Sequence, residues 1–198
     1  MILGIDGQAV DKRGDNMRKI DIKYFDKIDD EEYLWYFCYG SNINIKRFMI
    51  YINGDEDGCF AHVNGCKDKT KPLDSKPYII RRRIYFARHS GKWNGGVAFL
   101  NYRSLGKVYG KIYKIKKSQF MDVLKQEHHL KDYNTVIYIG KYNRVPIYTF
   151  TSLYKLNDLE KPSKKYLETI KEGIKDTYKT LSNKKIDKYL SKIKGDDL

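Results

Sequence analysis

The sequence predicts one globular domain in which a β-sheet packs against helices. The length of 198 residues and the hydrophobic fraction of 41% are sufficient for a single sizeable core. Three consecutive segments between residues 78 and 115 are rich in β-branched and aromatic residues and are short enough to belong to one sheet. Segments with helical spacing of apolar residues stand before and after them in the chain.

The chain divides into an N-terminal extension, a main domain and a C-terminal tail. Residues 1–32 have scattered charge and little periodicity, so we expect an extension that lies along the body or is partly disordered. The main domain is expected over residues 33–178, and it contains an insertion at 53–77 dense in Gly, Asp, Asn, Lys and Pro. This insertion is either a lid over a site or a surface elaboration. Residues 179–198 form a lysine-rich tail with a short helix.

The stretch YFCYGSN, residues 36–42, changes character halfway. A strand over residues 33–39 is followed at once by Gly40, Ser41 and Asn42, which suit a tight turn. The next ten residues, INIKRFMIYI, have apolar residues at helical spacing. Two interpretations are open, a simple hairpin and a binding site at the end of a strand.

The remaining elements follow from the same patterns. The three strands of the predicted sheet begin at Tyr78, Gly95 and Gly106. A helix in SQFMDVLKQEHHL ends near Glu127. Two more strands, YNTVIYIG and VPIYTFTS, are joined by a hairpin at residues 141–144, and the helix in KPSKKYLETIKEGIKDTY closes the domain.

The net charge of +14 is compatible with nucleic acid, an anionic membrane surface or simple solubility. Lysine outnumbers arginine about threefold and is spread over the whole chain, whereas recognition of base edges favours arginine. We therefore expect no specific nucleic-acid partner. No stretch is long or apolar enough to span a bilayer, and the first residues lack the pattern of a secretory signal, so a cytoplasmic protein without a membrane partner is expected.

The three cysteines have no spacing that suggests a disulfide scaffold. Cys59, His62 and Cys66 form a C-x2-H-x3-C run that could supply three zinc ligands. A structural zinc site needs a fourth ligand, and no second cluster lies nearby in the sequence. The sequence therefore predicts a surface loop with partly buried thiols and no metal.

Three places in the sequence resemble the γ-glutamylcyclotransferase-like family, which includes the γ-glutamylamine cyclotransferases and the plant avirulence-induced proteins. YFCYGSN followed by Ile43 is similar to the family's Y-F-A-Y-G-S-N-L. GKVYGKIYKIKKSQFMDVLKQE resembles its strand with a central aromatic-Gly pair and the helix that delivers a glutamate. PSKKYL followed by EGIK is similar to its P-S-x-x-Y and E-G-A-K helix. The resemblance covers roughly residues 35–178 and implies an α+β fold, a small mixed β-barrel of about five to seven strands, closed or nearly closed, with flanking helices.

The resemblance also implies an intramolecular acyl transfer at one mouth of that barrel. The α-amine of a γ-glutamyl group attacks its own γ-carbonyl, which expels an amine or amino acid and leaves 5-oxoproline. Closure of a five-membered ring is favoured by proximity, so no cofactor and no metal are expected. Glu127 stands where the family's catalytic glutamate would be, and one partly buried carboxylate is sufficient to carry the proton from the α-ammonium to the leaving amine.

The other expected site residues bind the substrate. Backbone N–H groups of Gly40, Ser41 and Asn42 at the start of a helix suit a substrate carboxylate or a developing oxyanion. Tyr39 is expected to pack beneath or beside the ligand. Tyr166 matches the tyrosine of the family's P-S-x-x-Y motif and either brings its hydroxyl to the same mouth or is a core aromatic residue.

Some features leave two functions of this pocket open, catalysis and binding without catalysis. His128 and His129 depart from the family's Gly-containing continuation and either narrow the pocket, tune Glu127 or face solvent. A rim loop near the pocket is one position for Trp93, which the sequence does not place. The alternative to an enzyme is a protein that binds or sequesters an anionic small molecule, such as a nucleotide, in the same pocket. The sequence determines neither the leaving amine nor the oligomeric state.

Overall fold

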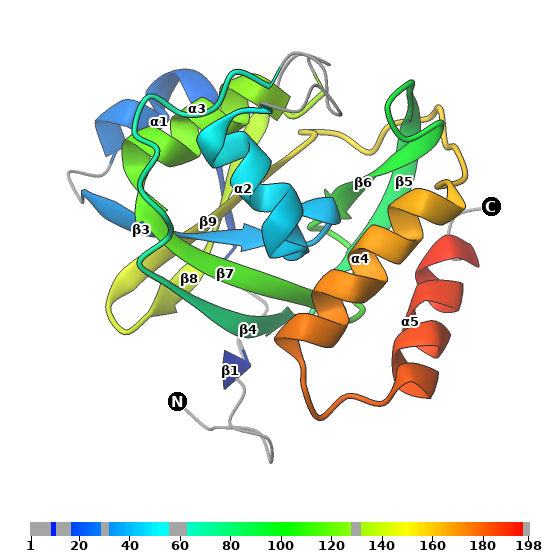
Figure 1. Cartoon of the computed structure of the whole chain (residues 1–198). Helices are drawn as coiled ribbons and strands as arrows, with labels where there is room; N and C mark the ends of the chain where they lie inside the picture. The colour runs from blue at the N-terminus through cyan, green and yellow to red at the C-terminus, as the bar shows by residue number, and fades with distance from the viewer. Residues whose placement is uncertain (1–8, 11–16, 29–31, 56–62, 128–131, 196–198) are drawn as a thin grey trace.

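A seven-stranded mixed sheet forms the centre of the computed structural model, which describes residues 9–10, 17–28, 32–55, 63–127 and 132–195 (Figure 1). The strands lie in the order β1-β4-β7-β3-β9-β8-β2. The pairs β1–β4 and β3–β9 are parallel, and the other neighbours are antiparallel. The strand bounds are Ala9–Val10 (β1), Arg18–Asp21 (β2), Tyr33–Cys38 (β3), Asp74–Ile80 (β4), Val108–Lys116 (β7), Thr135–Tyr142 (β8) and Val145–Thr151 (β9).

A separate two-stranded sheet is formed by β5 (Arg83–Ser90) and β6 (Gly95–Asn101). The single strand expected from Tyr78 is therefore two strands, because the chain leaves the large sheet at residues 81–82. Strand β6 approaches β9 through a side chain: the Thr151 hydroxyl accepts from the Leu100 N–H at 2.9 Å and donates to its carbonyl at 3.1 Å.

The α+β class is confirmed, but the expectation of a closed barrel is not met. Within the described part of the chain, β1 and β2 are the two edges of the large sheet and do not pair with each other. The Thr151 hydroxyl replaces a backbone ladder where the second sheet meets the first. The sheet is therefore open.

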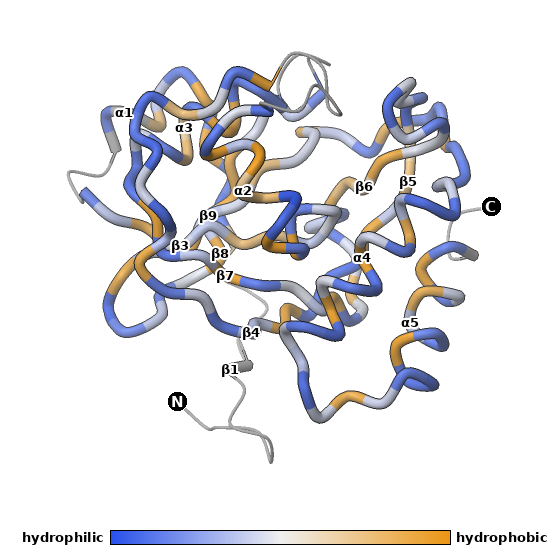
Figure 2. Tube along the Cα trace, in the orientation of Figure 1, coloured by the Kyte–Doolittle hydropathy of each residue, from blue (hydrophilic) through white to orange (hydrophobic). Residues whose placement is uncertain are grey.

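Helices flank the sheet. Helices α2 and α3 contact each other, and α3 packs against β3 and β7, whereas α4 packs against β7 and α5. Hydrophobic and hydrophilic residues alternate along α4 and α5, as expected for helices with one buried face (Figure 2). None of the helices in the described ranges is long and apolar enough to cross a membrane. The helix bounds are Ile22–Ile28 (α1), Ser41–Ile43 (the 3-10 helix η1), Ile45–Asn53 (α2), Lys117–Glu127 (α3), Lys164–Thr177 (α4) and Asn183–Gly195 (α5).

Strand β3 lies in the middle of the core. All residues from Leu34 to Cys38 are buried, which explains why this strand has a continuous apolar sequence without alternation. The ring of Tyr36 packs against Phe48, Phe120 and Phe150 with ring centroids 5.7, 5.5 and 5.2 Å apart. These aromatic contacts fix the end of β3. Residues 40–42, called the motif loop from here on, follow directly after it.

Part of the predicted N-terminal extension contributes to the sheet and the core. Strand β2 pairs with β8 at the sheet edge, and Phe25 of α1 is fully buried with its ring 5.2 Å from that of Phe120. The boundaries at residues 32 and 178 remain predictions.

The second half of the predicted insertion is fixed against α3. The side chain of Gln119 donates to the carbonyls of Asp68 and Thr70, and Lys116 forms an ion pair with Asp68 at 2.8 Å. The insertion ends where β4 begins at Asp74. Residues 56–62 lie outside the described residues, so the lid hypothesis stays a prediction.

Candidate active site

The motif loop ends β3 and turns directly into helical structure. Ser41 and Asn42 belong to the 3-10 turn η1, in which the Ile43 N–H donates to the Gly40 carbonyl at 3.1 Å. The side chain of Asn44 then caps α2 by accepting from N–H groups of its first turn. The hairpin interpretation is therefore wrong, and the loop is a strand-to-helix junction between α2, α4 and β6 (Figure 1).

Helix α4 holds this junction in place. A Cβ atom on Gly173 would lie 2.5 Å from the backbone nitrogen of Asn44, so only glycine allows α4 to approach so closely. The Asn44 side chain also donates to Glu172 at 3.2 Å. At the other end of α4, Ser163 is the N-cap and accepts from the Tyr166 N–H at 3.2 Å. The helix that contains PSKKYL and EGIK thus holds the loop that follows from YFCYGSN.

Glu127, the last residue of α3, contacts the motif loop. Its Oε1 atom accepts a hydrogen bond from the Nδ2 atom of Asn42 at 3.1 Å, although the two residues are 85 positions apart. The same amide nitrogen lies 3.3 Å from the hydroxyl of Tyr36. Because the nitrogen faces the carboxylate, the amide oxygen of Asn42 faces elsewhere.

That amide oxygen is buried and has no hydrogen-bond partner among the described residues. A buried acceptor without a donor costs free energy, so a polar ligand that donates to it is stabilised. Asn42 therefore holds the Glu127 carboxylate through its amide nitrogen and carries an unpaired buried acceptor at its amide oxygen.

The hydroxyl of Tyr166 reaches the loop from α4. It accepts a hydrogen bond from the Ala98 N–H at 3.1 Å and lies 2.9 Å from the position that a Cβ on Gly40 would occupy. Burial and the charge of Glu127 raise the pKa of Tyr166 to about 12, although hydrogen bonds from Ala98 and Ser41 act in the opposite direction. The tyrosine is therefore a neutral hydroxyl at physiological pH. The ring of Trp93 packs edge-on against it, with centroids 4.9 Å apart.

Tyr39 and Trp93 are both buried. The Tyr39 hydroxyl donates to the carbonyl of Phe150 at 2.8 Å, and burial raises its pKa well above the usual range. Tyr39 therefore packs beneath the loop, with its polar end directed into the core. Trp93 lies in the turn between β5 and β6, is 5% exposed and packs beside Tyr166.

Two further tyrosines surround Glu127. Burial raises the pKa of Tyr51, and the nearby Glu127 carboxylate raises it further. Burial also raises the pKa of Tyr133, with smaller contributions from neighbouring tyrosines and Glu127, and its hydroxyl donates to the Ala98 carbonyl at 2.9 Å. The carboxylate is thus set among neutral phenol groups in a partly dehydrated environment.

Two cations lie close to this carboxylate. Arg47 of α2 is 4% exposed, and its guanidinium carbon is 4.2 Å from the centre of the Tyr51 ring. Lys92, in the turn between β5 and β6, is an exposed residue. Partial burial and then repulsion by Arg47 lower the pKa of Lys92 to about 7, while Glu127 and Asp55 act in the opposite direction. The site therefore combines a carboxylate with positive potential suited to an anionic group.

The sequence did not identify Arg47, Lys92, Tyr51 or Tyr133 as part of this site. For Arg47 a signal was present, because a charged residue stands on the otherwise apolar face of the predicted helix. Lys92 and Tyr133 had no such signal, since they arrive from other segments and no local pattern distinguishes them.

Some predicted positions lie outside the described residues. These are His128 and His129, and also Cys59 and His62 of the possible zinc run. Cys66 is buried, and its thiol lies 3.3 Å from the Tyr51 carbonyl. Burial raises the pKa of this thiol to about 12. Among the described residues, no three His, Cys, Asp or Glu side chains are grouped as metal ligands.

Comparison with known sequences gives one relevant similarity. No protein-family model matches the chain. Histone deacetylase 5 of Arabidopsis thaliana is 28% identical over 203 residues, a match that covers 80% of this chain. The chain spans about 30% of the length of that curated relative.

Comparison with solved structures gives similarities along most of the chain. A γ-glutamyl cyclotransferase is 18% identical with a TM-score of 0.55, and the match covers 83% of this chain and 88% of that one. A human protein described as uncharacterized is 22% identical with a TM-score of 0.56 and the same two coverages. YkqA of Bacillus subtilis is 18% identical with a TM-score of 0.57, and the match covers 87% of this chain and 58% of that one. The γ-glutamylcyclotransferase-like fold expected from the three sequence motifs is therefore confirmed for this chain.

Proposed function

We propose that this protein is a γ-glutamylcyclotransferase-type enzyme that converts a γ-glutamyl compound into 5-oxoproline and a free amine or amino acid. The observation that carries the proposal is the contact between Asn42 and Glu127 beside the Tyr166 hydroxyl. It brings residues of all three sequence motifs together at one point. The fold of the solved γ-glutamyl cyclotransferase supports the same proposal.

Glu127 is the proposed proton carrier. Its carboxylate accepts a proton from the α-ammonium of the substrate, and the resulting amine attacks the γ-carbonyl to form the five-membered ring. When the tetrahedral intermediate collapses, the C–N bond to the leaving group breaks, and Glu127 returns the proton to the departing nitrogen. The nitrogen of the new ring still carries a second proton, which passes to the released amine, so the amine leaves as an ammonium ion. Protons then balance over the cycle without a cofactor.

The neighbouring groups orient the substrate. The α-ammonium is placed at the Glu127 carboxylate, which Asn42 holds through its amide nitrogen. The amide oxygen of Asn42, a buried acceptor without a partner among the described residues, is available to a further polar group of the substrate. The substrate carboxylate is attracted by Arg47 and Lys92, the two cations whose charges act near Glu127. Backbone N–H groups of the motif loop and the neutral hydroxyl of Tyr166 are the candidate donors to the oxyanion.

The test is a panel of γ-glutamyl amino acids, γ-glutamyl amines and glutathione, with 5-oxoproline measured directly by mass spectrometry. At least one panel member is expected to yield 5-oxoproline together with an equal amount of the released amine. If none reacts while a panel member binds in calorimetry, the protein is a binding protein and the enzymatic proposal is wrong. The deacetylase activity in the name of the Arabidopsis relative is not proposed here, because the match covers 30% of that protein.

Substrate affinity is expected to depend on the charge of Lys92. With a pKa of about 7, Lys92 is protonated below neutrality and loses its charge as the pH rises through 7. The KM for an anionic substrate should therefore rise by about threefold between pH 6 and pH 8.5, a modest effect because this lysine is partly solvated.

The variant Lys92→Arg separates this effect from other titrations at the site. Arginine stays charged over the whole range, so KM in this variant should lose most of its pH dependence while kcat keeps its own profile. Arg47, Glu127, Asp55 and Lys165 also act on Lys92 and are unchanged in the variant. An identical KM profile in both proteins would assign the pH dependence to another group.

A further inference from the structure

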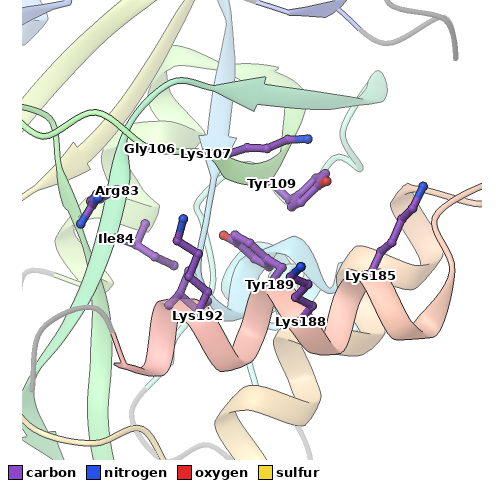
Figure 3. Close-up of a pocket in the computed structure, with 10 residues that line it drawn as sticks. Arg83, Ile84, Gly106, Lys107, Tyr109, Lys185, Lys188, Tyr189 and Lys192 are labelled. Carbon is purple, nitrogen blue, oxygen red and sulfur yellow. The ribbon is translucent and has the colours of Figure 1, made fainter.

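A cavity away from the candidate active site lies between helix α5 and the strands β5 and β7 (Figure 3). Its volume is about 280 Å³. Strand β5 connects it to the candidate active site, because Arg83 begins β5 at the cavity and Trp93 follows the end of β5 at the site. The residues that line the cavity are Arg83, Ile84, Gly106, Lys107, Tyr109, Lys185, Lys188, Tyr189, Lys192 and Ile193.

Five of these ten residues are cations and none is acidic. Lys185, Lys188 and Lys192 follow one another on α5 at spacings of three and four, which places them on one face of the helix. In Figure 3 their side chains extend from α5 toward the side on which Ile84 and Tyr109 lie. The cavity therefore concentrates positive charge within a chain of net charge +14.

The described part of the chain does not neutralise this charge. The three lysines of α5 and Lys107 form no ion pair with a described acidic residue, and Asp187 of the same helix pairs with Lys171 of α4 instead. The Lys107 ammonium lies 4.5 Å from the centre of the Tyr109 ring. Like charges held together in this way repel one another, so an anion bound between them is stabilised.

Tyr189 gives an independent sign of a ligand. Its side chain is 9% exposed, and its ring packs edge-on against Tyr109 with centroids 4.9 Å apart. Its hydroxyl is beside the Tyr109 backbone but has no hydrogen bond of good geometry with any described residue. Figure 3 shows this hydroxyl pointing into the space that the Lys192 ammonium also faces. A ligand oxygen placed there would receive a hydrogen bond that the protein leaves unused.

We propose that this cavity binds the phosphate chain of a small molecule with two or more linked phosphates. Linked phosphates concentrate several negative charges in a small volume, and lysine ammonium groups bind them as point charges. Ile84, Ile193 and the two tyrosines supply an apolar wall on which an organic group attached to the chain can rest. A nucleic-acid strand is less suitable, because such sites typically follow about 4–16 nucleotides, whereas this cavity holds about 280 Å³.

The test is isothermal titration calorimetry of the full chain with inorganic triphosphate, ATP and inorganic phosphate at physiological salt. Inorganic triphosphate is expected to bind with one site per chain, ATP with at least equal affinity, and inorganic phosphate at least about tenfold more weakly because it offers fewer charges. Lys188→Gln/Lys192→Gln should lower the affinity for triphosphate by about tenfold or more, and Tyr189→Phe by about threefold or more.

The matched control is Lys19→Gln/Lys141→Gln, which removes two exposed lysines from β2 and β8. This control should bind triphosphate like the unmodified protein, and thermal melting should show that all variants are folded. The proposal is overturned by equal losses in both double variants, by an absence of saturable binding at millimolar triphosphate, or by tighter binding of a single-stranded oligonucleotide without terminal phosphates. The last result would make the surface a nucleic-acid interface.

Discussion

Glu127→Gln is expected to lower kcat for 5-oxoproline formation by about 10²–10⁴-fold, the usual contribution of a positioned acid–base group. Glutamine keeps the shape of the side chain and the oxygen that accepts from Asn42, so the contact at 3.1 Å can be retained. It cannot accept and return the proton. The loss should therefore appear in kcat, with KM changed by much less.

The control for this prediction is Glu168→Gln. Glu168 is an exposed residue of α4 whose carboxylate lies 3.8 Å from the Lys164 ammonium, so its replacement removes the same charge away from the motif loop. Its activity should match that of the unmodified protein. Both rates are measured as 5-oxoproline released under saturating substrate, and thermal melting checks the fold. If Glu127→Gln kept activity within about threefold of the unmodified protein, Glu127 could not be the proton carrier.

The individual strands and helices of this chain could be predicted because each is determined by the residues of its own segment. Strand β3 is an apolar run that ends at Gly40, and α4 begins after the cap residue Ser163, so hydrophobic patterns and capping residues locate both. The segment YIIRRRIYFA was predicted as one strand, because its local pattern does not show that the chain changes sheets within it.

The open form of the sheet could not be predicted in this way. Closure depends on whether strands distant in the sequence exchange backbone hydrogen bonds, and local alternation carries no information about that pairing. At the point where β6 meets β9, the hydroxyl of Thr151 takes the place of the ladder. No single residue in the strand pattern indicates such a replacement.

The candidate site, too, could be predicted only in part. The motif resemblance was sufficient to select Asn42, Glu127 and Tyr166, which the structure brings into one neighbourhood. Lys92 could not be selected, because its place in the site depends on how the turn after β5 packs near α2. The lysines of α5 were predicted only as part of a lysine-rich tail with a short helix, since the packing of that helix beside β5 and β7 is what creates the cavity.

The support that α4 gives to the motif loop leads to the second large effect, in the variant Gly173→Ala. Alanine normally stabilises a helix interior by about 0.5–1 kcal/mol relative to glycine, so propensity alone predicts a more stable protein. Here the added Cβ would lie 2.5 Å from the Asn44 nitrogen and 2.7 Å from the Ile43 carbonyl carbon, which are backbone atoms that cannot rotate away. We expect the clash to dominate and the free energy of unfolding to fall by about 1–2 kcal/mol.

The same variant tests whether α4 positions the catalytic groups. Displacement of Ile43 and Asn44 moves the adjoining Asn42, which holds Glu127, so kcat should fall by about tenfold or more even at temperatures where the protein remains folded. Urea unfolding and 5-oxoproline release measure the two effects separately. Gly91→Ala is the control, because a Cβ there meets nothing within 4 Å and both quantities should stay unchanged. If Gly173→Ala were more stable than the unmodified protein, helix propensity would outweigh the contact and α4 would not constrain the loop. If it were destabilised but fully active, the loop would tolerate the shift, and the position of Asn42 would not limit the rate.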